Sequence, residues 1–251
     1  MFIVRLRHRG IPRWAALEGE AYRLFSSPTP WEDDHLEGPT YPFQPTDLMA
    51  PACPGKIVAI GLNYLDHNSE MKMDSPADPV LFLKPPSALL DPGGTILLPR
   101  VSERVDYEAE LAVVFKKRVK NATPAEARDA LWGYTCCNDV TARDLQKKDG
   151  QWTRAKGYDT FCPLGPWLNT TFQEKDQSIR CRVNGSLRQE SRLSSMIHRV
   201  TELVSFISSV MTLDPLDVLT TGTPSGIGPL KSGDRVEVDI EGIGTLWNLV
   251  K

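Results

Sequence analysis

Residues 106–115 read Asp106-Tyr107-Glu108-Ala109-Glu110-Leu111-Ala112-Val113-Val114-Phe115, an alternating run typical of a β-strand with two carboxylates near its start. Because strand side chains repeat every two residues, Glu108 and Glu110 share one face, which continues through Ala112 and Val114. A buried carboxylate is costly, and two neighbouring carboxylates repel each other. The pattern therefore predicts a cation between the glutamates, best supplied by a hard divalent metal; the alternative is a solvated strand face with ion pairs.

Composition and charge argue against several classes of protein. The chain has 251 residues and a net charge of −3, from 29 basic and 32 acidic side chains that are scattered along it. This distribution argues against a nucleic-acid partner. No apolar stretch reaches the roughly 20 residues of a transmembrane helix, and residues 1–5 lead into alternating charge rather than a signal-peptide core. Five cysteines without a CxxC pair indicate neither a disulfide framework nor a zinc site. We expect a cytoplasmic, soluble protein with no membrane partner.

The sequence predicts a division near residue 50. Strand candidates at residues 2–7, 14–18 and 21–25 make residues 1–50 a small N-terminal β meander. The proline-rich residues 39–45 are interpreted as a linker. Residues 51–251 are the predicted catalytic domain.

The larger part of the chain is predicted to be mostly strands with few helices. The strand candidates lie at residues 57–60, 80–83, 95–98, 111–115, 180–183 and 236–240. Helices are expected after Thr123, which caps a helix with proline in its first position, and over residues 196–211. Asn184-Gly185 predicts a hairpin turn. Regular βαβ spacing is missing, so the predicted fold class is α+β, mostly β, with a mixed sheet rolled into a barrel-like core rather than a Rossmann or TIM-barrel fold.

A third carboxylate, Asp139, ends the apolar run that begins at Tyr134. From a neighbouring strand it could meet Glu108 and Glu110, and three carboxylates without cysteine or histidine select magnesium, manganese or calcium over zinc or copper. The alternative is an aspartate that serves a turn or a helix cap.

His67 and Glu70 lie three residues apart, a spacing that places them on one face of a helix. A carboxylate that orients an imidazole makes a general base able to activate water near neutral pH. Such a pair also occurs by chance on helix surfaces, so its role depends on what lies around it.

Three further polar residues are candidates for substrate contacts. Arg143 and Gln146 could bind a substrate carboxylate, since a guanidinium group matches it with two parallel hydrogen bonds. Lys156 precedes a glycine and aromatic residues, which indicates a lysine held close to folded backbone. Taken singly, each is better explained as a solvated surface charge.

The glycine-rich loop Gly222-Thr223-Pro224-Ser225-Gly226-Ile227-Gly228 could offer backbone amides to an anion. It lacks the lysine of a phosphate-binding loop, so a plain turn is the alternative.

Six ordered motifs together resemble the fumarylacetoacetate hydrolase family, in particular its short members, over about residues 51–251. The motifs are Gly61-Leu62-Asn63-Tyr64 with His67 and Glu70, Phe82-Leu83-Lys84-Pro85, Asp106 to Leu111, Asn138 to Gln146, Lys156 to Phe161, and Thr221 to Gly228. The resemblance implies a mixed β-roll fold and homodimers.

The resemblance also implies roles for individual residues. Glu108, Glu110 and Asp139 match the magnesium ligands, and Lys156 matches the lysine beside metal and substrate. His67 and Glu70 match a dyad that activates water on a short lid helix, and Arg143, Gln146 and Thr223 match substrate contacts.

These roles predict a magnesium-dependent hydrolase of C–C bonds that acts on a small acylpyruvate-type 2,4-diketo acid, with Mn²⁺ or Ca²⁺ as alternative metals. The first alternative keeps the same site but makes the protein an isomerase or decarboxylase of aromatic-catabolism intermediates, or an oxaloacetate decarboxylase. A more distant one is a metal-dependent phosphohydrolase, or a non-catalytic module that binds metal or an anion.

Overall fold

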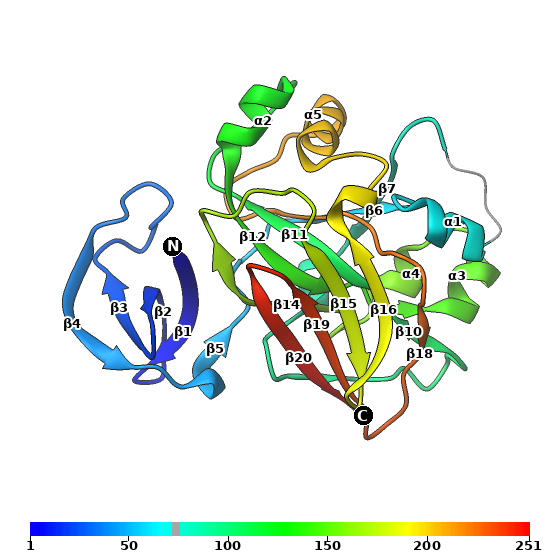
Figure 1. Cartoon of the computed structure of the whole chain (residues 1–251), viewed down its shortest axis with the longest axis horizontal. Coiled ribbons are helices and arrows are strands. Elements are labelled where there is room, and N and C mark those ends of the chain that lie inside the picture. Colours follow the sequence, from blue (N-terminus) through cyan, green and yellow to red (C-terminus); the bar gives the residue numbers. More distant parts are fainter. Residues whose placement is uncertain (72–75) are drawn as a thin grey trace.

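The computed structural model describes residues 1–71 and 76–251 and is mostly β with few helices, as predicted (Figure 1). The largest sheet runs in the order β4 (Leu36–Pro42), β3 (Ala21–Phe25), β2 (Ile11–Glu18), β1 (Phe2–His8), β14 (Cys162–Asn169), β12 (Leu131–Asn138), β11 (Ala109–Phe115), β17 (Val218–Thr220), β6 (Ile57–Gly61) and β7 (Val80–Lys84). Two short strands join it, β5 (Leu48–Met49) on β1 and β8 (Leu89–Leu90) on β14. The sheet is mixed, because the β6–β17 and β8–β14 pairs are parallel.

Two smaller sheets complete the β structure. One contains β16 (Ser186–Arg192), β15 (Ser178–Val183), β19 (Arg235–Ile240), β20 (Gly244–Val250) and β9 (Thr95–Ile96); the other contains β13 (Thr141–Ala142), β10 (Val105–Tyr107) and β18 (Gly228–Pro229). The helices are α1 (Leu65–Met71), α2 (Pro124–Ala130), α3 (Arg143–Asp149), α4 (Thr153–Lys156) and α5 (Val200–Val210), with 3-10 turns at Pro45–Asp47, Pro86–Ala88 and Leu193–Ser195. Helices α1, α3 and α4 lie together at the end of the molecule away from β1–β4 (Figure 1). No helix among the described residues is long and apolar enough to cross a membrane.

Strand β11 lies at the centre of the core, and all seven of its residues are buried. Leu111 and Val113 pack in the main apolar cluster, which also holds Leu203 and Ile207 of α5. Ala112 and Val114 of β11 pack in a second apolar cluster on the opposite face of the strand. Burial on both faces makes β11 a rigid base for whatever lies at its N-terminal end.

The N-terminal meander is an extension of the largest sheet. β1 pairs with β14 through Phe2 opposite Asn169, and Trp14 packs edge-on against Trp132 with the ring centroids 5.0 Å apart. The division of the chain near residue 50 stays a proposal, and a deletion that tests it is given in the Discussion.

Predictions that depend on turn residues, a helix cap or strand alternation are confirmed. The three predicted strands of the meander form, Asn184-Gly185 joins β15 to β16, and Thr123 caps α2 in a reciprocal capping box with Glu126.

Three predictions of element boundaries were wrong. Residues 39–42 of the expected linker belong to β4, an edge strand, where the missing N–H of a proline is tolerated. The helix expected from residue 196 begins at Val200, because the N–H groups of Ile197 and His198 donate to Asn63 instead. The run at residues 106–115 is broken at Glu108, which separates β10 from β11.

Candidate active site

Because of the break at Glu108, β10 and β11 belong to two different sheets. β10 pairs with β13 and β18, whereas β11 pairs with β12 and β17. Where the strand partners change, side-chain oxygens replace the backbone carbonyls as acceptors. The N–H of Glu108 donates to Asn138 Oδ1 at 2.9 Å, and the N–H of Ala109 donates to Gln189 Oε1 at 3.0 Å. Glu108 is thereby held out of the sheet in a defined place.

The three predicted carboxylates converge. Glu108, Glu110 and Asp139 each offer an oxygen within 4.8 Å of the others, and their exposed fractions are 4%, 1% and 1%. Asp139 follows the end of β12 beside the start of β11, where its N–H donates to the carbonyl of Glu108 at 2.9 Å. The alternative of a solvated strand face is therefore wrong.

Three cations surround two of these carboxylates. Lys156 donates to Glu108 Oε2 at 2.7 Å and to Asp139 Oδ2 at 2.5 Å, Arg143 donates to Glu108, and the buried Lys84 donates to Asp139 Oδ1 at 2.5 Å. Burial alone raises the pKa of Glu108, but the charges of Lys156 and Arg143 outweigh it and hold this pKa below its ordinary value. Burial lowers the pKa of Lys156, but the negative charges of Asp139 and Glu108 raise it by more, so this pKa lies above its ordinary value.

Glu110 has no cation partner among the described residues. Its Oε2 accepts a hydrogen bond from the N–H of Gly222 at 2.9 Å, and its other oxygen accepts none from residues 1–71 or 76–251. Burial, and then the charges of Asp139 and Glu108, raise the pKa of Glu110 well above its ordinary value. An uncompensated buried carboxylate beside two others fits a divalent cation, and an all-oxygen donor set suits a hard ion such as Mg²⁺.

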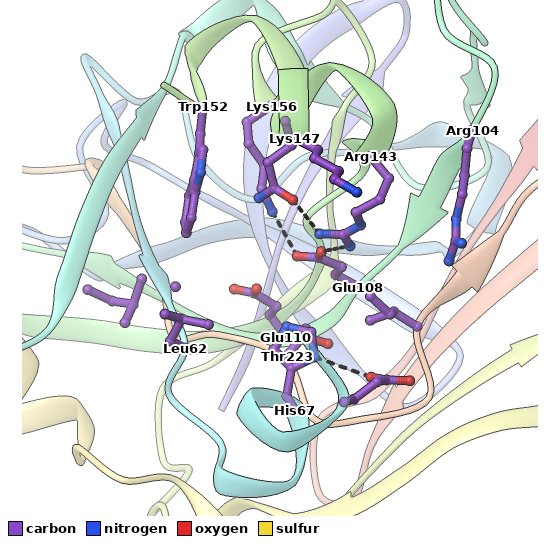
Figure 2. A pocket seen from close by; sticks show the side chains of 15 residues that line it. Leu62, His67, Arg104, Glu108, Glu110, Arg143, Lys147, Trp152, Lys156 and Thr223 are labelled. Atoms are coloured by element: carbon purple, nitrogen blue, oxygen red, sulfur yellow. Dashed lines mark hydrogen bonds and ion pairs between the residues drawn. The ribbon is translucent and has the colours of Figure 1, made fainter. Parts of the chain in front are cut away.

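A pocket of about 560 Å³ opens above this cluster. It is lined by Ile60, Gly61, Leu62, His67, Glu70, Arg104, Glu108, Glu110, Arg143, Gln146, Lys147, Trp152, Lys156, Thr223 and Ile227. Arg143 and Lys156 reach Glu108 from α3 and α4 on one side, and Glu110, Thr223 and His67 lie together on the other (Figure 2). The pocket therefore gathers eight of the nine residues predicted as a site, and Asp139 lies just outside its lining.

His67 and Glu70 form the predicted pair on α1. His67 is 6% exposed, and its Nδ1 lies 3.4 Å from Glu70 Oε2. The N–H of Gly226 donates to both oxygens of Glu70, at 3.1 and 3.2 Å, and Ser225 Oγ donates to Asp66 at 2.8 Å. The glycine-rich loop thus holds α1 in place over the pocket.

This use of the loop leaves few of its amides free to form an anion-binding nest. Three of its amides are already committed to carboxylates of the chain itself, that of Gly222 to Glu110, that of Ser225 to Asp66 and that of Gly226 to Glu70. Gly222 has φ +92°, and a side chain there would also lie 2.8 Å from Asn63 Cβ, so only glycine fits.

The guanidinium group of Arg143, predicted to bind a substrate carboxylate, already forms hydrogen bonds with three side chains of the protein. Its Nε donates to Asp106 at 3.0 Å and its Nη1 to Gln146 Oε1 at 2.6 Å, besides the bond to Glu108. Since Gln146 accepts through its oxygen, its NH₂ group remains as a donor for the pocket.

Sequence reasoning missed several residues of the site. Lys84, at the end of β7, is buried on the same side as Phe82, and period-two alternation along this strand could have found it. Arg104 and Lys147 line the pocket mouth, but nothing in the sequence distinguishes them from other surface cations. Trp152 packs so closely that a Cβ on Gly61 would lie 2.6 Å from its ring.

Comparisons with known proteins identify the family of this chain. The family profile described as "Fumarylacetoacetate (FAA) hydrolase C-terminal" matches residues 56–251. The chain is 44% identical over 216 residues to the mitochondrial oxaloacetate tautomerase of Xenopus laevis, covering 81% of this chain and 68% of that protein.

Solved structures are similar over the whole chain. The 5-carboxymethyl-2-hydroxymuconate delta-isomerase of Mycobacterium smegmatis superposes with a TM-score of 0.92 at 42% identity, covering 100% of this chain and 99% of that one. The 2-hydroxyhepta-2,4-diene-1,7-dioate isomerase of Mycobacterium marinum gives 0.91 at 43% identity, with 100% and 98% covered. The predicted family and its fold are confirmed, and this chain belongs to the fumarylacetoacetate hydrolase family.

Proposed function

We propose that the protein is a metal-dependent enzyme that moves a proton at the carbon beside the oxo group of a small 2-oxo acid, and that its reaction is the isomerisation or tautomerisation of a 2-oxo dicarboxylate. Glu108, Glu110 and Asp139 would hold the ion, with Mg²⁺ expected first and Mn²⁺ or Ca²⁺ as alternatives. When bound, the ion would act as a Lewis acid that polarises the 2-oxo group.

The observation that carries this proposal is the position of His67. It is buried in the wall of the same pocket as Glu108 and Glu110, and its Nδ1 faces Glu70. A carboxylate at Nδ1 selects the tautomer that carries its proton there, which leaves the lone pair of Nε2 as the proton acceptor. Nε2 makes no hydrogen bond with the described residues. His67 is therefore oriented as a general base for a C–H group or a water molecule in the pocket.

The mouth of the pocket favours a second negative charge on the substrate. Lys147 forms no ion pair within the described residues, and Arg104 uses one edge of its guanidinium group on Asp106, at 2.9 and 3.1 Å. Leu62 and Trp152 line the pocket on the side opposite Arg104 (Figure 2). An extended dicarboxylate would have one carboxylate near the ion and the other near Arg104 and Lys147. The relatives' names describe chemistry on such acids.

A second candidate is hydrolysis of the C–C bond of an acylpyruvate, the reaction expected from the sequence. The same dyad supports it, because His67 oriented by Glu70 can take a proton from water as readily as from carbon. Decarboxylation of oxaloacetate would need no such water. A phosphohydrolase is less well supported, because such enzymes often assemble two metals, and the described residues contain one carboxylate cluster.

The test follows enol absorbance of oxaloacetate and of acetylpyruvate with purified protein, in Mg²⁺ and in excess chelator. Loss of the oxaloacetate enol without pyruvate release would identify a tautomerase, whereas pyruvate release identifies decarboxylation or, from acetylpyruvate, hydrolysis. His67→Ala should lower the rate by about 10²–10⁴-fold with Mg²⁺ affinity retained in calorimetry. His35→Ala, an exposed histidine outside the pocket, is the matched control. Undiminished turnover in His67→Ala would overturn the role of His67.

A further inference from the structure

Gln189 is the one buried residue of β16, a strand whose other side chains are exposed or half-buried. Its amide makes three hydrogen bonds inside the molecule. Oε1 accepts from the N–H of Ala109 at 3.0 Å, and Nε2 donates to the carbonyl of Pro224 at 2.8 Å and to Thr223 Oγ1 at 2.9 Å. Gln189 therefore joins the start of β11, between the two glutamates, to the loop that carries Thr223.

The direction of each of these hydrogen bonds follows from the partners. A backbone N–H can only donate, so Ala109 must face Oε1, and a carbonyl can only accept, so Pro224 must face the NH₂ group. The Thr223 hydroxyl then accepts from the same NH₂ group and donates its own proton to the carbonyl of Ala109 at 2.9 Å. Its only remaining capacity is a lone pair, so toward any further partner Thr223 Oγ1 is an acceptor.

The backbone of Thr223 has the opposite character. Its N–H forms no hydrogen bond with the described residues, although the residue is 3% exposed and lines the pocket. A buried N–H without a partner is costly, and a bound ligand or water would relieve that cost. Thr223 thus combines an available donor with an available acceptor.

We propose that Gln189 is a positioning residue that sets specificity: by fixing the Thr223 proton on Ala109, it makes Thr223 bind a hydroxyl group at Oγ1. A hydroxyl can accept from the N–H and donate to Oγ1, whereas a carboxylate or keto oxygen has no donor to meet at Oγ1. This inference rests on the proposed function, in which the hydroxyl is either that of a substrate enol or that of a water molecule.

Crystals of the Mg²⁺-loaded protein test this assignment without turnover. In a complex with oxalate, which has acceptors only, we expect a water molecule within hydrogen-bond distance of Thr223 Oγ1. In a complex with glycolate, the ligand's own hydroxyl at Oγ1 would show that the bound hydroxyl group belongs to the substrate. A water molecule retained at Oγ1 would show that the site binds water. An oxalate oxygen bonded to Oγ1 overturns the proposal, and because no reaction is needed, this outcome is independent of a failed activity assay.

Variants provide the second test. Thr223→Val keeps the N–H and the shape but removes the acceptor, and Gln189→Glu loses the donors that orient the hydroxyl. Each should lower kcat/KM roughly fivefold to tenfold, with oxalate affinity in calorimetry largely retained, and Thr223→Ser should restore much of the loss. Gln177→Glu, whose amide also bonds backbone groups but lies outside the pocket, is the control.

A purely structural role would give a different pattern. It would lower the melting temperature and weaken oxalate and substrate binding together, and this pattern, or an unchanged kcat/KM in both variants, overturns the proposal. If Gln189→Glu does not fold, the comparison of Thr223→Val with Thr223→Ser decides alone.

Discussion

Replacing Lys84 by methionine should destabilise the metal-free protein strongly and the Mg²⁺-loaded protein much less. Lys84 is 1% exposed, and its ammonium group donates to Asp139 Oδ1 at 2.5 Å and to the carbonyl of Val140 at 3.3 Å. Methionine has a similar length and no charge, so the substitution removes the cation and keeps most of the packing. Asp139 then retains Lys156 as its one cation partner among the described residues.

The size of the effect follows from the burial of both partners. Removing one partner of a buried ion pair costs about 3–5 kcal/mol, which for a chain of this length lowers Tm by roughly 10 °C. A divalent ion supplies positive charge at the same carboxylate, so Mg²⁺ should bind more tightly to Lys84→Met than to the wild type. Each tenfold gain in affinity recovers about 1.4 kcal/mol at saturating Mg²⁺.

The assay is urea unfolding of both proteins in excess chelator and in saturating Mg²⁺. Lys56→Met is the matched control, because Lys56 pairs with Asp217, a carboxylate that is also 1% exposed but lies outside the pocket. Its loss of stability should be the same in both buffers. An equal loss for Lys84→Met in both buffers would refute the reasoning, and a larger loss in Mg²⁺ would mean that Lys84 holds Asp139 in place as a ligand.

Four further predictions test other parts of the site and of the chain. Glu110→Gln should abolish the stabilisation by Mg²⁺ in thermal unfolding without destabilising the metal-free protein, because the glutamate it replaces has no cation partner there. Arg104→Met combined with Lys147→Met should raise KM for oxaloacetate about tenfold and leave KM for acetylpyruvate unchanged in the same assay. Deletion of residues 1–50 exposes the edge of β14, so we expect the remaining chain to aggregate; a soluble, folded product in circular dichroism would instead show that residues 51–251 are an independent domain. Light scattering should give the mass of a dimer, as family membership leads us to expect; a monomer would contradict it.

The sequence predicted those parts of the fold that depend on local chemistry. The capping box at Thr123, the Asn184-Gly185 turn and the alternating strands of the meander depend on neighbours a few residues away, and all of them formed. It also predicted the carboxylate cluster, because two neighbouring buried glutamates favour a cation between them, although Glu108 lies at the break before β11 rather than within one strand.

The boundaries that failed depended on residues distant in sequence. Asn63 accepts from the N–H of His198 across 135 positions and so delays the start of α5, and Asn138 and Gln189 supply the acceptors that permit the break at Glu108. Single-sequence periodicity carries no information on such partners. The same limit applies to Lys84, whose charge is meaningful only once Asp139 lies beside it.

The distribution of charge around the cluster favours a metal site over an ion-pair network. Glu108 pairs with Lys156 and Arg143, and Asp139 pairs with Lys156 and Lys84. Glu110, the less exposed glutamate of the cluster, forms no ion pair within the part of the chain that the structure describes. In a network that served stability alone, a neutral side chain at position 110 would avoid the desolvation of an unpaired charge. A carboxylate at this position, beside two others, is what a site for an external divalent cation requires. Glu110, rather than the more heavily bonded Glu108, is therefore the residue whose substitution most directly separates metal binding from folding.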